Sequence, residues 1–279
     1  MTHPYNGIRA VITTKHEKQK LIAPIFQKLG IELLHFEWDT DQLGTFSKEI
    51  PRTLSQRETV IKKARVGMAQ LNHSYGVASE GSVGPDISLP ILNSTVEAIT
   101  WVDDVNGFEL VEFERGLDVV AVKESFANLD GIDEFLKRAD FPNHGLILYP
   151  EGEKDPIYKG IRSRSELEAV LDECLKRSSK KVAVVESDLR AHMSPSRSAV
   201  IAKCAEKLLN RLSKLCPSCQ LPGFGEIGRL SGLPCESCGE NVVTALKGNV
   251  MGCVKCEHKL EKLNGKTEAS ASSCLSCNP

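Results

Sequence analysis

The 279-residue sequence has no apolar run long enough to cross a bilayer as a helix. Its first residues, MTHPYNGIRAVITT, lack the basic and then apolar segments of a secretory signal peptide. Lysine and arginine (35 residues) nearly balance aspartate and glutamate (37 residues), and the formal net charge is −2. A large nucleic-acid-binding surface would require an excess of basic residues. We therefore expect a cytoplasmic protein with no membrane partner, and the charge balance argues against nucleic acid as a partner.

Cysteine is scarce over most of the chain, where Cys174 and Cys204 lie alone in segments of helical pattern. We expect both to be core residues. The other eight of the ten cysteines form four C-x-x-C units near the carboxyl terminus. Without an export signal, such pairs favour metal ligands over disulfides. We predict two structural zinc ions, with an iron–sulfur cluster as the main alternative. The predicted ligands are Cys216, Cys219, Cys235, Cys238, Cys253, Cys256, Cys274 and Cys277.

The pairing of these units is less well determined by the sequence. The segment CESCGENVVTALKGNVMGCVKC resembles a zinc ribbon, in which a β-hairpin of NVVTAL and NVMGCV turns at residues 247–249 and joins two knuckles. The outer units would then share the second ion in a nested arrangement, while sequential and cross-braced pairings remain open. Cysteine would fill every ligand position, so the ions would be structural and not catalytic.

The composition of this carboxyl-terminal segment bears on its partners. Residues 213–279 carry seven basic and six acidic residues, and Phe224 is their only aromatic residue. A nucleic-acid reader usually shows a basic stripe and stacking side chains. We therefore expect the zinc module to support a homodimer or to dock a protein partner.

Short β-rich apolar runs alternate with amphipathic runs over residues 1–212, which is typical of an α/β domain. Asn106-Gly107 separates two strand patterns and predicts a tight hairpin, because both residues tolerate positive φ. The hairpin makes the predicted sheet mixed. A smaller zinc-ribbon domain would follow at residues 213–279. We expect strands at 8–14, 31–37, 75–80, 94–102, 108–114, 117–124, 145–150 and 181–187, and helices at 16–28, 55–71, 163–177 and 194–215.

Polar and charged residues gather at four of the predicted element boundaries, in the segments TTKHEK, ETVIKKAR, ASEGS and SPSRS. Cations and hydroxyls at a helix start favour phosphate binding. Carboxylates favour a hard cation such as Mg²⁺. Glu58 also has capping-box spacing from Ser55, so a purely structural role is open for it. The candidate residues are Thr13, Thr14, Lys15, Lys18, Glu58, Lys63, Glu80, Ser196, Arg197 and Ser198.

These segments resemble motifs of the inosine/xanthosine triphosphatase family, enzymes that remove deaminated purine nucleoside triphosphates. The family's T-T-N-x-x-K strand end resembles TTKHEK, and its E-N-A-x-x-K-A-R helix resembles ETVIKKAR. Its acidic strand end resembles residues 80–82, and its T-R-S-S helix start resembles residues 196–198. The resemblance spans roughly residues 8–205, in short motifs. The chain is also similar to a bacterial family of unknown function with a cysteine-rich tail ending in CNP.

The resemblance implies an inosine-triphosphatase-like fold and Mg²⁺-dependent hydrolysis of non-standard purine nucleoside triphosphates. Glu58 and Glu80 would hold Mg²⁺ and position the attacking water, and Lys18 would act on the phosphates. The implied substrate-binding residues are Thr13, Thr14, Lys15, Lys63, Ser196, Arg197 and Ser198. Lys15 stands where the family has asparagine. This difference keeps open a non-catalytic nucleotide- or phosphate-binding protein whose zinc module docks a protein or nucleic-acid partner.

Overall fold

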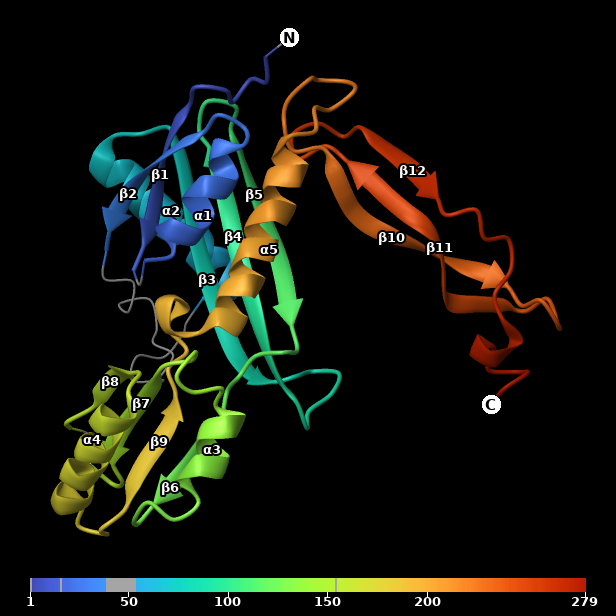
Figure 1. Cartoon of the computed structure of the whole chain (residues 1–279). Helices are drawn as coiled ribbons and strands as arrows, with labels where there is room; N and C mark the ends of the chain where they lie inside the picture. The colour runs from blue at the N-terminus through green and yellow to red at the C-terminus, as the bar shows by residue number, and fades with distance from the viewer. Residues whose placement is uncertain (1, 16, 39–53, 154) are drawn as a thin grey trace.

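Three β-sheets organise the chain in the computed structural model, which describes residues 2–15, 17–38, 54–153 and 155–279 (Figure 1). His16, where the sequence predicts the first helix to begin, lies outside the described residues. The first sheet takes its strands from residues 9–116, the second from residues 123–187 and the third from residues 225–263. The protein is therefore of mixed α/β class, as predicted.

The first sheet has five strands in the order β2-β1-β3-β4-β5. β1 pairs in parallel with β2 and β3, whereas β4 is antiparallel to β3 and β5. The prediction of a mixed sheet is therefore confirmed. Gly107 lies in the turn between β4 and β5 with a φ of 68°. The strands are β1 (Arg9–Thr14), β2 (Glu32–Glu37), β3 (Tyr75–Pro85), β4 (Asn93–Asp103) and β5 (Phe108–Gly116).

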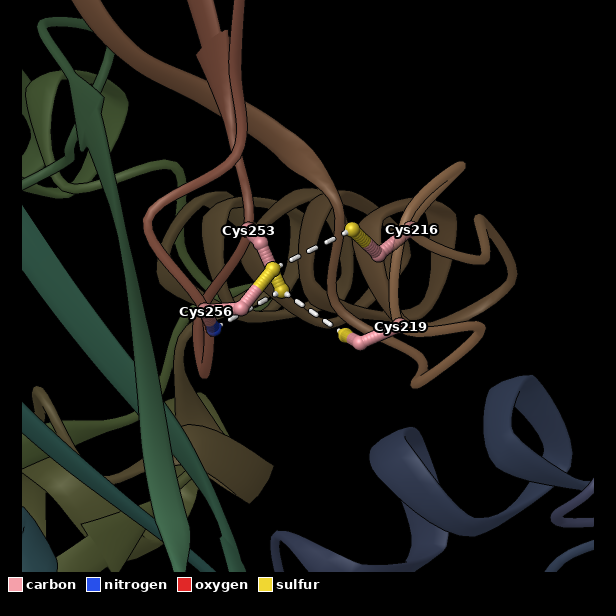
Figure 2. Close-up of side chains that lie close together, drawn as sticks. All are labelled: Cys216, Cys219, Cys253 and Cys256. Atoms are coloured by element: carbon pink, nitrogen blue, oxygen red, sulfur yellow. Dashed lines mark hydrogen bonds between the residues drawn. The ribbon is translucent and has the colours of Figure 1, made fainter.

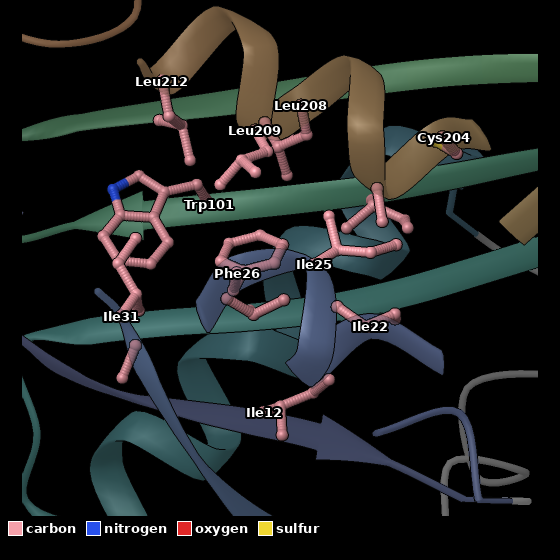
Figure 3. Close-up of a cluster of buried hydrophobic side chains, with 14 of the residues drawn as sticks. Ile12, Ile22, Ile25, Phe26, Ile31, Trp101, Cys204, Leu208, Leu209 and Leu212 are labelled. Atoms are coloured by element: carbon pink, nitrogen blue, oxygen red, sulfur yellow. The ribbon is translucent and has the colours of Figure 1, made fainter. Parts of the chain in front are cut away.

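Three helices pack on this sheet, with α1 and α5 on one face and α2 on the other (Figure 1). Apolar residues recur every three or four positions along α5, so one stripe of the helix is buried. Figure 3 shows Leu208, Leu209 and Leu212 of α5 beside Trp101 and Phe26. Trp101 is fully buried, and its ring centroid lies 6.1 Å from that of Phe26. The helices are α1 (Gln19–Gln27), α2 (Gln56–Leu71) and α5 (Pro195–Leu212).

The second sheet is antiparallel throughout, in the order β6-β9-β7-β8, and lies beyond one end of the first sheet (Figure 1). It has its own apolar core, which includes Phe135, Leu148 and Leu171. Of the strand expected at 117–124, only the last two residues belong to β6. A short helix, α3, and the strand β8 were not predicted. The elements are β6 (Lys123–Phe126), α3 (Ile132–Arg138), β7 (Leu146–Pro150), β8 (Tyr158–Ile161), α4 (Arg164–Arg177), β9 (Ala183–Ser187) and the 3₁₀ turn η2 (Ala191–Met193).

The third sheet follows α5 and corrects the predicted zinc-ribbon hairpin. The residues expected to turn at 247–249 lie inside one continuous strand, β11. Gly248 pairs with Leu230 on one side and Leu263 on the other. A Cβ at Gly248 would lie 2.4 Å from the carbonyl oxygen of Lys262, so glycine permits close pairing here and does not mark a turn. The elements are β10 (Gly225–Pro234), β11 (Asn241–Gly252), β12 (Lys259–Leu263) and the 3₁₀ turn η3 (Ala271–Ser273).

Within the part of the chain that the structure describes, no helix combines the length and the apolar character needed to cross a membrane. The longest described helix, α5, has 18 residues and a polar face that includes Lys203 and Glu206.

Helix α2 begins where the sequence predicts and is capped as its pattern indicates. The Ser55 hydroxyl accepts a hydrogen bond from the Glu58 backbone N–H (3.2 Å), and the Glu58 carboxylate accepts one from the Ser55 N–H (2.8 Å). The reciprocal capping box is therefore confirmed. Further along α2, a Cβ at Gly67 would lie 2.0 Å from Oγ1 of Thr13 and 2.9 Å from Cγ1 of Val11. The helix can lie this close to β1 only because residue 67 is glycine.

We expect Gly67→Ala to lower the free energy of unfolding by about 1–3 kcal/mol, because the new methyl group overpacks the contact with β1. An exposed glycine in a helix would show the opposite sign, a gain of about 0.5–1 kcal/mol on replacement by alanine. Urea unfolding followed by circular dichroism measures the change. Thr13→Ala removes Oγ1, so Gly67→Ala should cost less in that background. Equal costs in both backgrounds would contradict the steric explanation.

Candidate functional site

The eight clustered cysteines form two groups of four, and all sulfur atoms within a group lie within 4.8 Å of one another. In the first group, Sγ of Cys216 and Sγ of Cys256 are 3.7 Å apart, and Sγ of Cys219 and Sγ of Cys253 are 3.6 Å apart (Figure 2). Zn–S bonds of about 2.3 Å in a tetrahedral site place sulfurs about 3.8 Å apart. A disulfide would require about 2.05 Å. The first centre is therefore compatible with a structural zinc ion and not with disulfides.

The second centre has the same geometry. Sγ of Cys235 and Sγ of Cys277 are 3.8 Å apart, and Sγ of Cys238 and Sγ of Cys274 are 3.6 Å apart. Each centre contains four thiols, so a bound ion would have no open position for a substrate. The ligand set agrees with the prediction of two structural zinc sites.

The pairing of the C-x-x-C units corrects the nested arrangement expected from the sequence. The first unit pairs with the third and the second with the fourth, which is the cross-braced alternative. The reason is the length of β11, which spans 12 residues between the second and third units. An extended strand of that length covers about 35 Å, because each residue adds roughly 3.3 Å. The second and third units therefore lie at opposite ends of the sheet and cannot share an ion.

Backbone amides prepare the cysteine sulfurs for metal binding. The N–H of Ser237 donates to Sγ of Cys235 (3.4 Å), and the N–H of Lys255 donates to Sγ of Cys253 (3.3 Å). Backbone hydrogen bonds from Cys238 and Ser237 lower the pKa of the Cys235 thiol to about 7. The thiolate is the form that binds metal, so these amides favour the binding form of Cys235, whereas hydrogen bonds with the neighbouring thiols of Cys238 and Cys235 raise the pKa of Cys277 in the same centre to about 12.

A second group of candidate functional residues lies beyond the carboxyl end of β1, midway along β3 and β4. We call Lys18, Lys63, Glu80, Glu97 and Arg197 the charged cluster, and each is at most 8% exposed. The Arg197 guanidinium donates to Oε1 of Glu97 (Nε–Oε1 2.6 Å), and Nζ of Lys18 lies 3.8 Å from Oε2 of Glu97. Lys63 forms an ion pair with Glu80. The cluster therefore joins three cations and two carboxylates in a buried setting.

The two faces of the sheet supply different members of the cluster. Glu80 stands opposite Ala98, and Glu97 opposite Gly81, in the antiparallel register of β3 and β4. Because successive side chains alternate between faces, the two carboxylates lie on opposite sides of the sheet. Lys63 comes from α2 on one side and Arg197 from α5 on the other. Lys18 follows the end of β1, and its charge interacts with both ion pairs.

Gly81 allows the ion pair of Glu97 and Arg197 to lie directly on the backbone of β3. A Cβ at Gly81 would come 2.3 Å from one Arg197 nitrogen and 2.4 Å from both carboxylate oxygens of Glu97. A larger residue would displace the ion pair.

Burial controls the charge of Lys18. Desolvation is the largest effect and lowers the pKa of Lys18 to about 8; Glu97 opposes this shift, and the positive charges of Arg197 and Lys63 add to it. Below that pH Lys18 is charged, and it joins Lys63 and Arg197 as a third buried cation. Lysine and arginine side chains are the groups that proteins use to bind phosphate.

Several predicted site residues lie outside the charged cluster. Glu58 is exposed and its carboxylate caps α2, so the structure does not bring it together with Glu80. Thr13 points towards Gly67 of α2. The Thr14 hydroxyl donates to the carbonyl oxygen of Lys15 (2.9 Å).

Two of the three serines of the SPSRS segment, Ser196 and Ser198, also turn away from the cluster. The Ser196 hydroxyl lies 2.9 Å from Nε2 of His144, next to the second sheet. The Ser198 hydroxyl donates to the carbonyl oxygen of Ala191 (2.5 Å). Of this segment, only Arg197 contributes to the charged cluster.

Sequence reasoning missed Glu97 and Gln56. The Gln56 side-chain amide donates to the carbonyl oxygens of Glu80 (3.1 Å) and Val96 (2.8 Å), which ties the start of α2 to β3 and β4. Glu97 is the only charged residue between Asn93 and Trp101. A lone carboxylate inside an apolar strand is the signal that could have identified it, because such a group needs a buried partner.

We expect elemental analysis of the purified protein to give two zinc ions per chain. The double variant Cys216→Ser/Cys253→Ser should retain one ion, because both residues belong to the first centre. Nested pairing would instead place these two residues in different centres and remove both ions. Cys174→Ala, which changes a buried core cysteine, should retain two ions and serves as the control. A count near zero in the double variant would contradict cross-braced pairing.

Comparison with known proteins identifies a family for most of the chain. No curated protein matches the sequence. A family model described as a domain of unknown function (DUF6671) matches residues 63–279. The match includes Lys63, Glu80, Glu97 and Arg197 of the charged cluster and all eight cysteines of the two centres. The chain therefore belongs to the DUF6671 family.

Proposed function

We propose that the charged cluster binds the phosphate groups of a nucleoside triphosphate and that the protein hydrolyses this substrate with Mg²⁺. The observation that carries the proposal is the convergence of three buried cations, Lys18, Lys63 and Arg197, in one cluster. Phosphate oxygens are strong acceptors for lysine and arginine. The proposed substrates are the non-standard purine triphosphates that the sequence resemblance implies.

The origin of the cluster residues supports this proposal. Each of the four segments that resemble triphosphatase motifs contributes one residue: Lys18, Lys63, Glu80 and Arg197. These segments are distant in the sequence, so it is the fold that brings their side chains together in one cluster.

Glu80 is the cluster residue that would hold Mg²⁺. Mg²⁺ is commonly bound through one or two carboxylates together with substrate phosphates, and one carboxylate therefore fits. The ion would neutralise charge on the phosphates. Glu58 has no part in the proposed site, because its carboxylate is engaged at the start of α2.

A second candidate function is non-catalytic nucleotide or phosphate binding, with the zinc module docking a partner. Across the described ranges, the two cysteine centres are the only groups of three or more histidine, cysteine, aspartate or glutamate side chains that converge as metal ligands. The position of Glu58 favours this candidate, because its carboxylate caps α2 and does not meet Glu80.

Turnover assays with Mg²⁺ and inosine, xanthosine, adenosine or guanosine triphosphate test the first function. We expect Lys18→Met to raise the dissociation constant for the triphosphate about 10- to 100-fold, since a hydrogen bond to a charged group contributes about 1.5–3 kcal/mol. Isothermal titration calorimetry measures this constant. Lys62→Gln, which removes an exposed lysine beside Lys63, is the matched control and should bind normally.

The outcomes separate the two candidates. Release of phosphate or pyrophosphate that is lost in Glu80→Gln supports hydrolysis at the cluster. Binding without release above the Glu80→Gln rate supports the non-catalytic candidate. If Lys18→Met and Lys62→Gln bind alike, the cluster is not the phosphate site.

The affinity for triphosphate should depend on pH through Lys18. Its pKa of about 8 means that Lys18 is charged below pH 8 and neutral above it. We expect binding to weaken as the pH rises from 7 to 10, with a limiting loss of about tenfold per pH unit above 8 if the site requires the charged form. The terminal phosphate loses its last proton below about pH 8, so the charge of the triphosphate chain is constant over the range in which the tenfold loss per unit develops. The Lys18→Met variant should show no such loss, and a pH-independent affinity in the unsubstituted protein would contradict the role of Lys18.

A further inference from the structure

A chain of three hydrogen-bonded side chains lies where α5 meets the second sheet. The Ser196 hydroxyl is 2.9 Å from Nε2 of His144, and Nδ1 of His144 is 2.8 Å from Oδ2 of Asp140. Asp140 and His144 lie between α3 and β7, whereas Ser196 lies in the first turn of α5. These residues form a nucleophile, a base and a carboxylate in the order used by serine hydrolases. None of them belongs to the charged cluster or to the cysteine centres.

Backbone amides constrain the directions of the hydrogen bonds in this chain. The Ser196 N–H donates to Nε2 of His144 (3.2 Å), so Nε2 is an acceptor and carries no proton. The ring proton is then on Nδ1 and is donated to Asp140. Oγ of Ser196 accepts from the Val120 N–H (3.1 Å) and lies 3.4 Å from the Ser194 hydroxyl, so its own proton points to Nε2 when Ser194 is the donor. His144 is thus held in the tautomer that a general base requires.

The surroundings of the three residues suit this chemistry. His144 is 3% exposed, so its ring is held in place, while Ser196 is partly exposed. The Asp140 side chain is half exposed, and hydrogen bonds from Asn143 and His144 lower the pKa of its carboxyl. Asp140 is therefore ionised at neutral pH and can stabilise a positive charge on the ring. The positive end of α5, an 18-residue helix, favours negative charge near Ser196.

We propose that Ser196, His144 and Asp140 form a second active site that hydrolyses small carboxylic esters. This inference is independent of the function proposed for the charged cluster. Esters are the assigned class because an alkoxide leaves more readily than the amine of an amide and needs less assistance from the protein.

In the acylation step, Oγ of Ser196 bonds to the acyl carbon and its proton moves to Nε2 of His144. The carbon–oxygen bond to the leaving group then breaks, and Nε2 gives the proton to the departing alkoxide, which leaves as an alcohol. Water next attacks the acyl carbon and gives a proton to Nε2. That proton returns to Oγ as the carboxylic acid departs. Asp140 remains ionised throughout and holds the imidazolium in position.

Labelling of the full-length, zinc-loaded protein with a fluorophosphonate tests the proposal. Oγ of Ser196 would bond to phosphorus and fluoride would leave, so intact mass spectrometry should show one adduct, and peptide mapping should locate it at Ser196. We expect Ser196→Ala to abolish the adduct. His144→Gln and Asp140→Asn should slow labelling by about 10²-fold or more, as expected for loss of general-base assistance. The same variants should lose a burst of nitrophenolate from p-nitrophenyl acetate.

Ser213→Ala, which changes an exposed serine at the opposite end of α5, is the matched control and should label at the normal rate. Thermal unfolding of each variant identifies any that do not fold. Asp140→Asn, at a half-exposed position, keeps the test decisive if His144→Gln unfolds. No adduct at Ser196, or labelling that is equally fast in folded Asp140→Asn, would overturn the proposal and leave the three residues as a structural link between α5 and the second sheet.

Discussion

The carboxylate of Glu97 forms ion pairs with two buried cations beyond the carboxyl end of β1. Its side chain has no exposed surface and contacts Arg197 of α5 and Lys18, which precedes α1. Breaking a buried ion pair by removing one partner costs about 3–5 kcal/mol, because the remaining charge is left without compensation. Glu97 therefore couples a strand and two helices through charge, at a point where the apolar core of the sheet ends. The arrangement of the charged cluster depends on this one residue.

Helix α5 extends this coupling to the rest of the molecule. Its first turn contributes Arg197 to the cluster and Ser196 to the contact with the second sheet. Its last turn contributes Arg211, which donates to the carbonyl oxygen of Gly223 (3.2 Å) and to Glu112 of β5 (2.8 Å). Cys216, the first cysteine of the first centre, follows only four residues after the helix ends. One rigid element therefore relates the cluster, the second sheet and the zinc module to one another.

The features that could be predicted from the sequence depend on residues that lie close together in the chain. Ser55 and Glu58 cap α2 because both partners lie within one turn, and the C-x-x-C units revealed their chemistry through their own spacing. Lys18 and Arg197 could be found because each stands at the start of a helix. Glu97 stands out as a lone carboxylate in an apolar strand, but its partner lies 100 residues away, so the sequence alone could not identify that partner. The segment around Gly248 has turn-forming residues, but pairing with strands on both sides overrides that local preference.

The continuity of β11 also gives the carboxyl-terminal sheet a mechanical property. Its first centre is anchored to the main body, since Val254 packs against the first core and Nζ of Lys255 donates to the carbonyl oxygen of Gly107 (3.0 Å). The second centre lies about 35 Å away at the other end of the strand. A tilt of about 10° at the anchored end would move that tip by about 6 Å. The number of residues in β11 therefore determines how far the second centre lies from the anchored end, and how far a small tilt would displace it.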